Sequence, residues 1–236
     1  MRAEDASRSQ EEETIVKVLL INGSPRWKGN TNRALEEAAA ALQAEGVETE
    51  LVWIGNKEIR GCIACGVCGK TGEKRCVFGE DCCNDLIAKG AECDGFIVGS
   101  PVYYAGMAGS LRALMDRMFY AGGANFRFKP AAGIAVARRA GAIEAADQIN
   151  KYFQINCQPL VSSSYWNIAY GRTPGEAEGD GEGLHTMRVL GRNMAWMLKC
   201  IEAGRAAGIN APGMEPRPPT TTTISARKPK LAPAVG

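Results

Sequence analysis

Four cysteines in one short stretch carry the clearest chemical signal in the sequence. Cys62, Cys65, Cys68 and Cys76 follow the spacing C-x2-C-x2-C-x7-C, with glycines between them. Three thiolates this close in a glycine-containing loop can converge on an iron–sulfur cluster, and a fourth thiolate completes the ligand set. An all-thiolate zinc site is an alternative, although zinc more usually takes two separated C-x2-C pairs. A thiol-rich loop that holds no metal is the third interpretation.

The other five cysteines fall into two groups. Cys82 and Cys83 follow the cluster closely and are spare candidates for the fourth ligand. Cys93, Cys157 and Cys200 lie in or beside expected regular elements, so we expect them to be buried packing residues. The sequence starts without a signal-peptide pattern, so nine cysteines indicate a reducing, cytoplasmic setting with free or ligating thiols.

A second group of chemically suited residues follows the apolar run from Ile15 to Ile21. Such a run is typical of a strand buried on both faces, and a helical pattern with Leu35 and Leu42 on one side comes after it. The intervening loop places backbone N–H groups and a helix N-terminus around an anion. An arginine and short polar side chains add donors suited to a phosphate. The predicted phosphate-binding residues are Ser24, Arg26, Gly29, Asn30 and Thr31.

The kind of phosphate can be narrowed by exclusion. The loop has no G-x-G-x-x-G, and Asn30-Thr31 stands where a Walker loop has Lys-Ser/Thr. Residues 22–31 resemble the loop N-G-S-P-R-x-x-G-N-T of the flavodoxin-like NAD(P)H-dependent FMN reductases, and they match it at every specified position. In that family the loop holds the phosphate of FMN, so the resemblance implies an FMN site here.

A second loop, residues 100–106, offers the flat faces of Tyr103 and Tyr104 to a planar cofactor. By itself the segment is equally typical of a surface turn. Residues 99–117 are similar to the family pattern that ends L-[KR]-x-x-x-D-R, and the resemblance implies that this loop lines the isoalloxazine ring. The implied contacts are Pro101, Val102, Tyr103, Tyr104, Ala105 and Gly106. Arg138, Arg139 and Gly141 match the third family loop in position, and Arg138 is a further expected cofactor contact.

The cysteine spacing also resembles one branch of this family. Iron–sulfur flavoproteins have a compact cysteine motif that holds a [4Fe–4S] cluster beside FMN, and many relatives keep a similar loop with no cluster. The resemblance as a whole covers roughly residues 14–205, with specific motifs at the first two loops and at the cysteines. It implies Cys62, Cys65, Cys68 and Cys76 as cluster ligands.

Regular elements must position these loops. Strands and helices alternate along the sequence, which predicts an α/β fold with a parallel sheet and right-handed crossovers. The family resemblance implies that the fold is flavodoxin-like, with a doubly wound, five-stranded parallel sheet of order 2-1-3-4-5 and helices on both faces. The loops after strands one and three should then flank one site. After the first strand, we expect strands over 48–54, 94–100 and 131–137 and near Leu160, with helices over 84–92, 108–120, 142–153 and 184–201.

The length and net charge of the chain limit its domain organisation and its classes of partner. The 236 residues fit one flavodoxin-like domain over 14–207 with a Cys-rich loop at 61–83. We expect a disordered lead-in over 1–13 and an extended or disordered tail over 208–236. A net charge of +2 indicates no nucleic-acid partner, and the apolar runs are too short to cross a membrane. One histidine, His185, argues against histidine-rich zinc sites and histidine-based triads.

The resemblance implies an FMN-dependent oxidoreductase that accepts a hydride from NADH or NADPH. Electrons would pass to a small acceptor, such as a quinone, a flavin or an azo or nitro aromatic, or to a protein such as ferredoxin. No catalytic side chain is predicted, because the flavin supplies the chemistry. The alternatives are an iron–sulfur flavoprotein or a flavodoxin-like carrier without a small-molecule substrate, and a zinc-binding structural module. We also expect a homodimer or higher homo-oligomer, joined through the Met-rich C-terminal helix and the region of Trp166.

Overall fold

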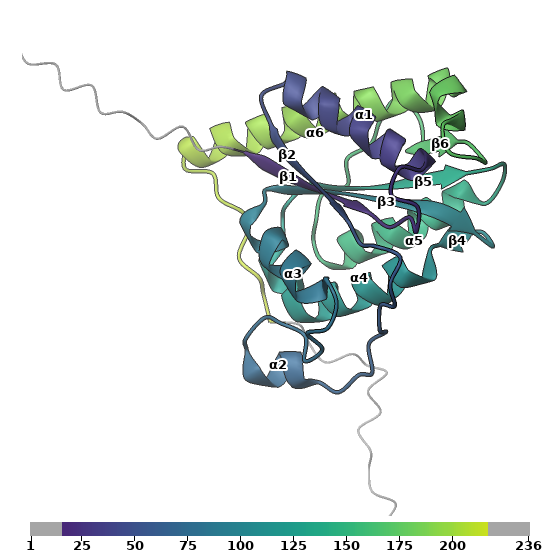
Figure 1. Cartoon of the computed structure of the whole chain (residues 1–236). Helices are drawn as coiled ribbons and strands as arrows, with labels where there is room; N and C mark the ends of the chain where they lie inside the picture. Colours follow the sequence, from purple (N-terminus) through teal and green to yellow (C-terminus); the bar gives the residue numbers. More distant parts are fainter. Residues whose placement is uncertain (1–15, 217–236) are drawn as a thin grey trace, which may run out of the picture.

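The fold is an α/β sandwich, seen in a computed structural model that describes residues 16–216 (Figure 1). The predicted lead-in and the tail beyond 216 lie outside the described residues. The strands are β1 (Lys17–Asn22), β2 (Glu48–Trp53), β3 (Gly95–Tyr103), β4 (Gly106–Met107), β5 (Ala131–Ala137) and β6 (Ile168–Tyr170). The helices are α1 (Asn30–Ala44), α2 (Val67–Thr71), α3 (Cys83–Glu92), α4 (Gly109–Gly122), α5 (Ala142–Ile155) and α6 (Gly181–Ala206), with short 3-10 turns η1 (Gly123–Asn125) and η2 (Glu176–Gly179).

Five strands form a parallel sheet in the order β2-β1-β3-β5-β6, as the alternating pattern predicts. The sixth strand, β4, pairs antiparallel with the end of β3 and makes a small hairpin there. This hairpin was not predicted, because β3 runs on through Pro101 and Val102 into the segment expected to be a loop. The confirmed order places the carboxyl ends of β1 and β3 side by side, which is where ligands bind in open α/β sheets.

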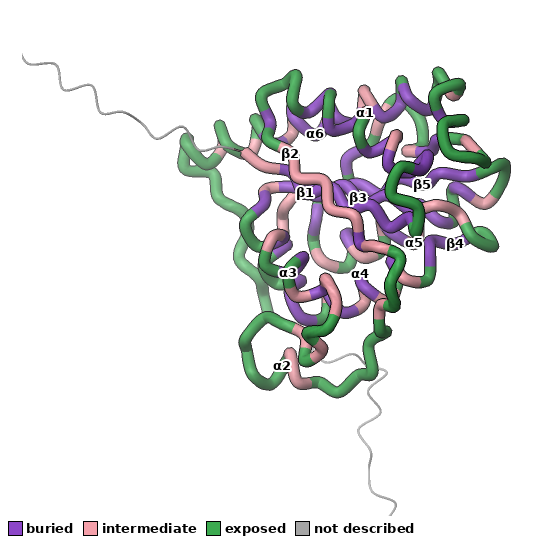
Figure 2. The backbone as a smooth tube through the Cα atoms, in the orientation of Figure 1, coloured by how far each residue is buried: buried purple, intermediate pink, exposed green. Residues whose placement is uncertain are grey.

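Helices cover both faces of the sheet. α1 and α6 lie on one face, and α3, α4 and α5 lie on the other (Figure 1). The central strands β1, β3 and β5 are buried along most of their length, as Figure 2 shows. Met187 and Met194 of α6 are fully buried against α1 and the sheet, so these methionines serve the core. Within the described residues, no helix is both long enough and apolar enough to cross a membrane.

The prediction of a strand near Leu160 is wrong in position. The chain pairs with Ala131 through the carbonyl of Pro159 and the N–H of Val161, which is a single isolated bridge. It then leaves the sheet through three serines and returns at Asn167, whose carbonyl accepts from the N–H of Ala135. The fifth parallel strand is therefore β6, and this shift changes which residues reach the carboxyl edge.

Two of the three cysteines predicted to be buried are exposed. Cys93 is buried, but Cys157 and Cys200 are exposed. Cys200 lies on the outward side of the amphipathic helix α6. Cys157 lies in a turn with a left-handed backbone, φ +58°. Position beside a regular element therefore did not indicate which way these side chains face.

Gly191 sets the distance between α6 and α1. A Cβ added there would lie 2.6 Å from the carbonyl oxygen of Ala38 and 2.7 Å from the Cβ of Ala41. Because a backbone oxygen cannot move aside cheaply, we expect Gly191→Ala to lower the free energy of unfolding by about 1–3 kcal/mol. This loss opposes the gain of roughly 1 kcal/mol that alanine brings within an exposed helix. Urea unfolding at constant m-value measures the difference.

Gly204→Ala is the matched control, because it lies on the same helix and an added Cβ there comes no closer than 3.8 Å to Ile209. We expect this variant to be as stable as the parent or slightly more stable. Equal stability of the two variants would show that α1 and α6 can separate at no cost, against the close contact described here.

Candidate functional site

The loop between β1 and α1 leaves a helix N-terminus open. Gly29 is the N-cap residue of α1, has an extended backbone, and gives no side-chain hydrogen bond to the first turn. The first N–H groups of the helix therefore have no capping side chain, although such groups need a partner. Asn30 and Thr31 begin the helix and are both buried. An open N-terminus with its partial positive charge suits a phosphate.

Hydrogen bonds within the loop fix its shape. The side chain of Asn22 accepts from the N–H of Ser24 at 3.0 Å and donates to Asn32 at 3.1 Å. The indole of Trp53, at the end of β2, donates to the carbonyl of Ser24 at 2.7 Å. The hydroxyl of Ser24 accepts from the N–H of Arg26 at 3.1 Å. The loop is thus held open by the protein itself, which lowers the conformational cost of binding.

A cavity of about 180 Å³ lies at the carboxyl edge of the sheet. Nine of the twelve predicted cofactor residues line it together: Ser24, Arg26, Gly29, Asn30, Thr31, Pro101, Val102, Tyr103 and Arg138. Val136, Gly171 and Arg172 complete the lining. The structure therefore brings the first two predicted loops and the third loop to one place, as the strand order requires.

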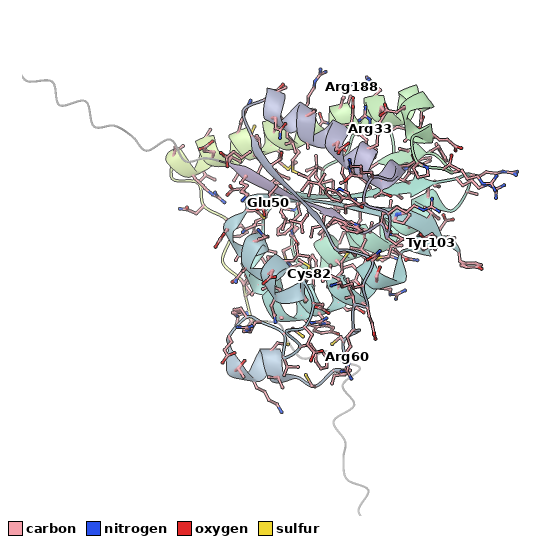
Figure 3. The ribbon with its side chains drawn as sticks, in the orientation of Figure 1. Arg33, Glu50, Arg60, Cys82, Tyr103 and Arg188 are labelled. Carbon is pink, nitrogen blue, oxygen red and sulfur yellow. The ribbon has the colours of Figure 1, made fainter. Side chains whose placement is uncertain are left out.

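The other three predicted residues do not line this cavity. Tyr104 and Ala105 form the tip of the β3–β4 hairpin with left-handed backbones, and Tyr104 is fully exposed. Gly106 pairs with Tyr103, and a Cβ there would come within 3.1 Å of the Gln148 side chain, which accounts for a glycine at this position. Figure 3 shows Tyr103 at the edge of the sheet. Of the two tyrosines, only Tyr103 contributes to the cavity.

The charged side chains that line the cavity are all positive. Arg26, Arg138 and Arg172 all line it, and no carboxylate does. Guanidinium groups bind phosphate through paired N–H donors. Thr31 as a whole residue is 2% exposed, lines the cavity, and makes no hydrogen bond through its hydroxyl to another described residue. The hydroxyl is therefore free to donate to a ligand or to water in the cavity. The donor set therefore fits a phosphate monoester.

Asn30 has a structural role that its motif did not reveal. Its side-chain N–H donates to the carbonyl of Thr173 at 2.9 Å, and its oxygen accepts from the N–H groups of Gly175 and Ala177 at 3.2 Å each. The side chain is thus committed to the segment after β6, and this segment carries Arg172 into the cavity. The backbone N–H of Asn30 remains at the open end of α1.

Arg172 was missed because β6 was misplaced. Residues that follow parallel strands gather at one edge of the sheet, so a fifth strand placed at Ile168–Tyr170 would have predicted Gly171 and Arg172 there. The useful signal was the short apolar run before Gly171. The fifth strand was predicted near Leu160 instead.

We expect Asn30→Ala to loosen the segment after β6. The change removes three hydrogen bonds of about 0.5–1.5 kcal/mol each, and leaves the N–H groups of Gly175 and Ala177 without that partner. Amide hydrogen exchange in residues 171–179 should become at least about tenfold faster, while the core strands β1 and β3 stay protected. Asn193→Ala, which removes one hydrogen bond to Ser162, is the matched control and should leave residues 171–179 unchanged. Unchanged exchange in Asn30→Ala would contradict this role.

The cysteine loop forms a second cavity, of about 440 Å³, on the side of the molecule that carries α2 (Figure 1). Cys62, Cys65, Cys68 and Cys76 all line it. The first two are exposed and the last two half-buried. Left-handed backbones at Ala64 and Gly66 let the loop bend tightly, so that three cysteines reach one cavity. The arrangement brings together the four predicted ligands.

The spare candidates do not share this cavity. Cys83 is fully buried in the core, and burial raises the pKa of its thiol to about 12. Burial also raises the pKa of Cys82, whose sulfur contacts the carbonyl of Ile54 at 3.9 Å. The buried Cys93 has its pKa raised to about 11 for the same reason. These three thiols lie outside the cavity that the four predicted ligands line, so position rather than acidity separates the two groups.

Within residues 16–216, no three Cys, His, Asp or Glu side chains converge as they would around a single metal ion. A mononuclear zinc site requires four donors at about 2.0–2.3 Å from one centre. A [4Fe–4S] cluster places each thiolate on a different iron, so its ligands are more widely spread. The four-thiol donor set and the cavity around it fit such a cluster.

Comparison with known proteins gives the family of this chain and several relatives. Residues 16–173 match the model of the family described as NADPH-dependent FMN reductase. An iron-sulfur flavoprotein of Methanocaldococcus jannaschii is 35% identical over 195 residues, which are 79% of this chain and 100% of the relative. An iron-sulfur flavoprotein of Methanosarcina thermophila is 29% identical over 195 residues, covering 80% of this chain and 99% of the relative.

A solved structure supports the fold. The flavodoxin described as a WrbA-like protein from Agrobacterium tumefaciens superposes with a TM-score of 0.57 at 16% identity. The superposition covers 79% of this chain and 99% of that one. At this identity the likeness concerns the flavodoxin-like sheet and its helices.

Proposed function

The chain belongs to the NADPH-dependent FMN reductase family, and from this premise we propose that it is an FMN-dependent oxidoreductase with a [4Fe–4S] cluster. FMN would occupy the cavity at the carboxyl edge of the sheet and take a hydride from NADH or NADPH. The cluster would be held by Cys62, Cys65, Cys68 and Cys76. Electrons would leave singly, to ferredoxin or a similar protein, or to a small acceptor.

The observation that carries the FMN assignment is the joining of three loops around one cavity that three arginines and an open helix N-terminus line. The N–H groups at the start of α1, the Thr31 hydroxyl and Arg26 would bind the phosphate. Arg172 and Arg138 would add positive charge on the opposite loops. Val102, Tyr103 and Val136 would give the flavin an apolar surface.

In this proposal the cofactors supply the redox chemistry, and the protein binds and positions them. A bound flavin supplies the hydride chemistry, and a bound cluster accepts and donates single electrons. The protein fixes the ligand by the hydrogen-bonded loop around Asn22 and Ser24 and by the segment that Asn30 holds. No side-chain acid or base is assigned, because hydride transfer to a flavin needs none from the protein.

Exposure favours a macromolecular partner for the cluster. Cys62 and Cys65 are exposed, and so are the neighbouring Ile63 and Tyr120. A cluster at an exposed loop can pass an electron to a docked protein, which is what a carrier or a ferredoxin-linked enzyme requires. The relatives named above are called iron-sulfur flavoproteins, which agrees with this second candidate role.

We also propose that two copies of the chain associate. Large apolar side chains are exposed at Trp166, Tyr165 and Trp196, and the first two stack edge-to-face with ring centres 4.8 Å apart. Aromatic residues of this kind are enriched in interfaces. We propose a homodimer through this region. Size-exclusion chromatography should give about twice the mass of one chain, and a flavin-loaded monomer would contradict the proposal.

The decisive experiment is anaerobic purification followed by flavin, iron and sulfide analysis. We expect about one FMN and about four irons per chain, with bleaching of the flavin band by NADH or NADPH. Reduction by a low-potential ferredoxin, with no response to either nucleotide, would favour the carrier role. Absence of flavin would overturn the FMN assignment, and flavin with zinc in place of iron would overturn the cluster assignment.

A further inference from the structure

Arg117 is a buried cation that the proposed chemistry does not use. It lies on α4, is 1% exposed, and has its side chain directed at the cysteine loop. A buried guanidinium is costly unless its donors are satisfied. An arginine side chain stays protonated in proteins. Arg117 is therefore a permanent positive charge next to the cysteines.

The guanidinium joins both ends of the cysteine loop to α4. One Nη donates to the carbonyl of Arg60 at 3.1 Å and pairs with the carboxylate of Asp81. The other Nη donates to the carbonyl of Phe78 at 3.0 Å. Arg60 precedes the first cysteine of the loop and Phe78 follows the last, so one side chain fixes the position of both flanks. This accounts for three of the four contacts of Arg117.

The fourth contact is to sulfur. The Nε–H of Arg117 donates to Sγ of Cys76 at 3.2 Å. A hydrogen bond from a full positive charge to a ligating sulfur is among the features that set the potential of an iron–sulfur cluster. One-electron reduction adds negative charge to the sulfur ligands, so such a donor stabilises the reduced form more than the oxidised form.

We propose that Arg117 is a positioning residue that raises the reduction potential of the cluster through its hydrogen bond to the Cys76 sulfur. The inference rests on the proposed function, because it requires a cluster on Cys76. It also distinguishes Cys76 from the other three cysteines, none of which receives a hydrogen bond from a charged side chain among the described residues. The four ligand sulfurs would then have unequal surroundings, because within residues 16–216 only the sulfur facing α4 receives a hydrogen bond from a charged side chain.

Other charges near the loop do not offer the same contact. Arg60 lies over the ring of Phe78 at 4.5 Å, and Figure 3 shows it in the loop region below α4. Asp116 borders the cavity, but its carboxylate accepts from the hydroxyl of Tyr152. Arg75 precedes Cys76 directly, is exposed, and makes no hydrogen bond to its sulfur. Arg75 is therefore a matched charge control.

The test is a redox titration of the anaerobically purified holoprotein, followed by electron paramagnetic resonance. Iron and sulfide are measured first, since absence of a cluster in the parent protein overturns the proposed cluster and this inference together. In Arg117→Gln the ratio of reduced to oxidised cluster at a fixed potential should fall on the order of tenfold, which is about 59 mV for one electron. Arg117→Lys keeps the positive charge but loses the planar, forked set of N–H donors. The reduction potential of this variant should fall by less than that of Arg117→Gln.

Two controls separate tuning from general disturbance of the loop. Arg75→Gln removes a charge beside Cys76 and should shift the potential less than Arg117→Gln does. Asp81→Asn removes the ion-pair partner of Arg117 and should not lower the potential, because the Nε–H donor stays. Unchanged potential in both Arg117 variants overturns the inference while the proposed function stands. Loss of iron with retained FMN in both variants also overturns it, since Arg117 would then serve only to hold the loop.

Discussion

Replacing Cys65 with alanine is expected to remove nearly all iron from the protein and to leave its flavin in place. Cys65 is exposed in the middle of the four-cysteine loop, and Cys62 and Cys68 line the same cavity on either side of it. Three thiolates would remain, and none of the other cysteines lines the cavity to replace the fourth. Iron should fall from about four atoms to less than about one per chain. Anaerobic iron and sulfide analysis with the visible spectrum measures this.

The FMN content should not change, because the cysteine cavity and the phosphate cavity share no lining residue. Cys200→Ala is the matched control: this thiol is also exposed, but it lies on α6. Its iron and flavin should equal those of the parent. Full iron in Cys65→Ala would remove Cys65 from the ligand set and direct attention to a different group of thiols.

Thr31→Val is expected to weaken FMN binding by about 10- to 100-fold. Valine has nearly the shape of threonine, and the Thr31 hydroxyl makes no hydrogen bond to another described residue. The change therefore removes only the donor offered to the ligand. A hydrogen bond to a charged group contributes about 1.5–3 kcal/mol, which corresponds to that range. Fluorescence titration of the apoprotein with FMN gives the affinity.

Riboflavin provides the sharpest control, because it lacks the phosphate. Its affinity should be the same for the parent and for Thr31→Val. Thr49→Val, on β2 away from the cavity, tests the substitution itself and should leave FMN binding unchanged. The unfolding free energy of the Thr31→Val apoprotein should stay within about 0.5 kcal/mol of the parent. Equal loss for riboflavin and FMN would place Thr31 against the ring system or in the general structure of the loop.

The sheet was predictable where local pattern and burial agree. β5 (Ala131–Ala137) is buried on both faces and is apolar throughout, and its predicted and observed bounds are the same. Gly46, shortly after the end of α1, has the left-handed backbone, φ +82°, that favours glycine after a helix. Alternation and handedness predicted a parallel sheet, and the family resemblance supplied its strand order.

The prediction was wrong where long-range contacts decide. Leu160 and Ile168 lie in similar short apolar runs, and only the pairing partners on β5 show which run makes a strand. Cys157 and Cys200 illustrate the same limit, because the side of an element that a residue faces depends on what packs against it. Arg172 was missed for the same reason, since it reaches the cavity by following β6 directly.

The residues of the candidate site were also predictable in part. The cysteine spacing and the residues 22–31 predicted two groups of residues, and each group lines one cavity in the structure. The β3–β4 hairpin was not predicted, and it places Tyr104 outside the cavity. Arg117 was noted only as the end of a motif. Its contacts to Arg60, Cys76 and Phe78 span 39 to 57 residues, and no local pattern records them.

The hydrogen bonds of Asn30 also bear on the order of events during synthesis. They join the first loop of the domain to a segment 143 to 147 residues later in the chain. A ribosome that adds about 5–20 residues per second needs roughly 7–30 s to make that stretch. The nascent chain therefore has α1 and an open helix end long before it has the opposite wall of the cavity. Flavin uptake should therefore follow the synthesis of the segment after β6, and should not begin when α1 emerges.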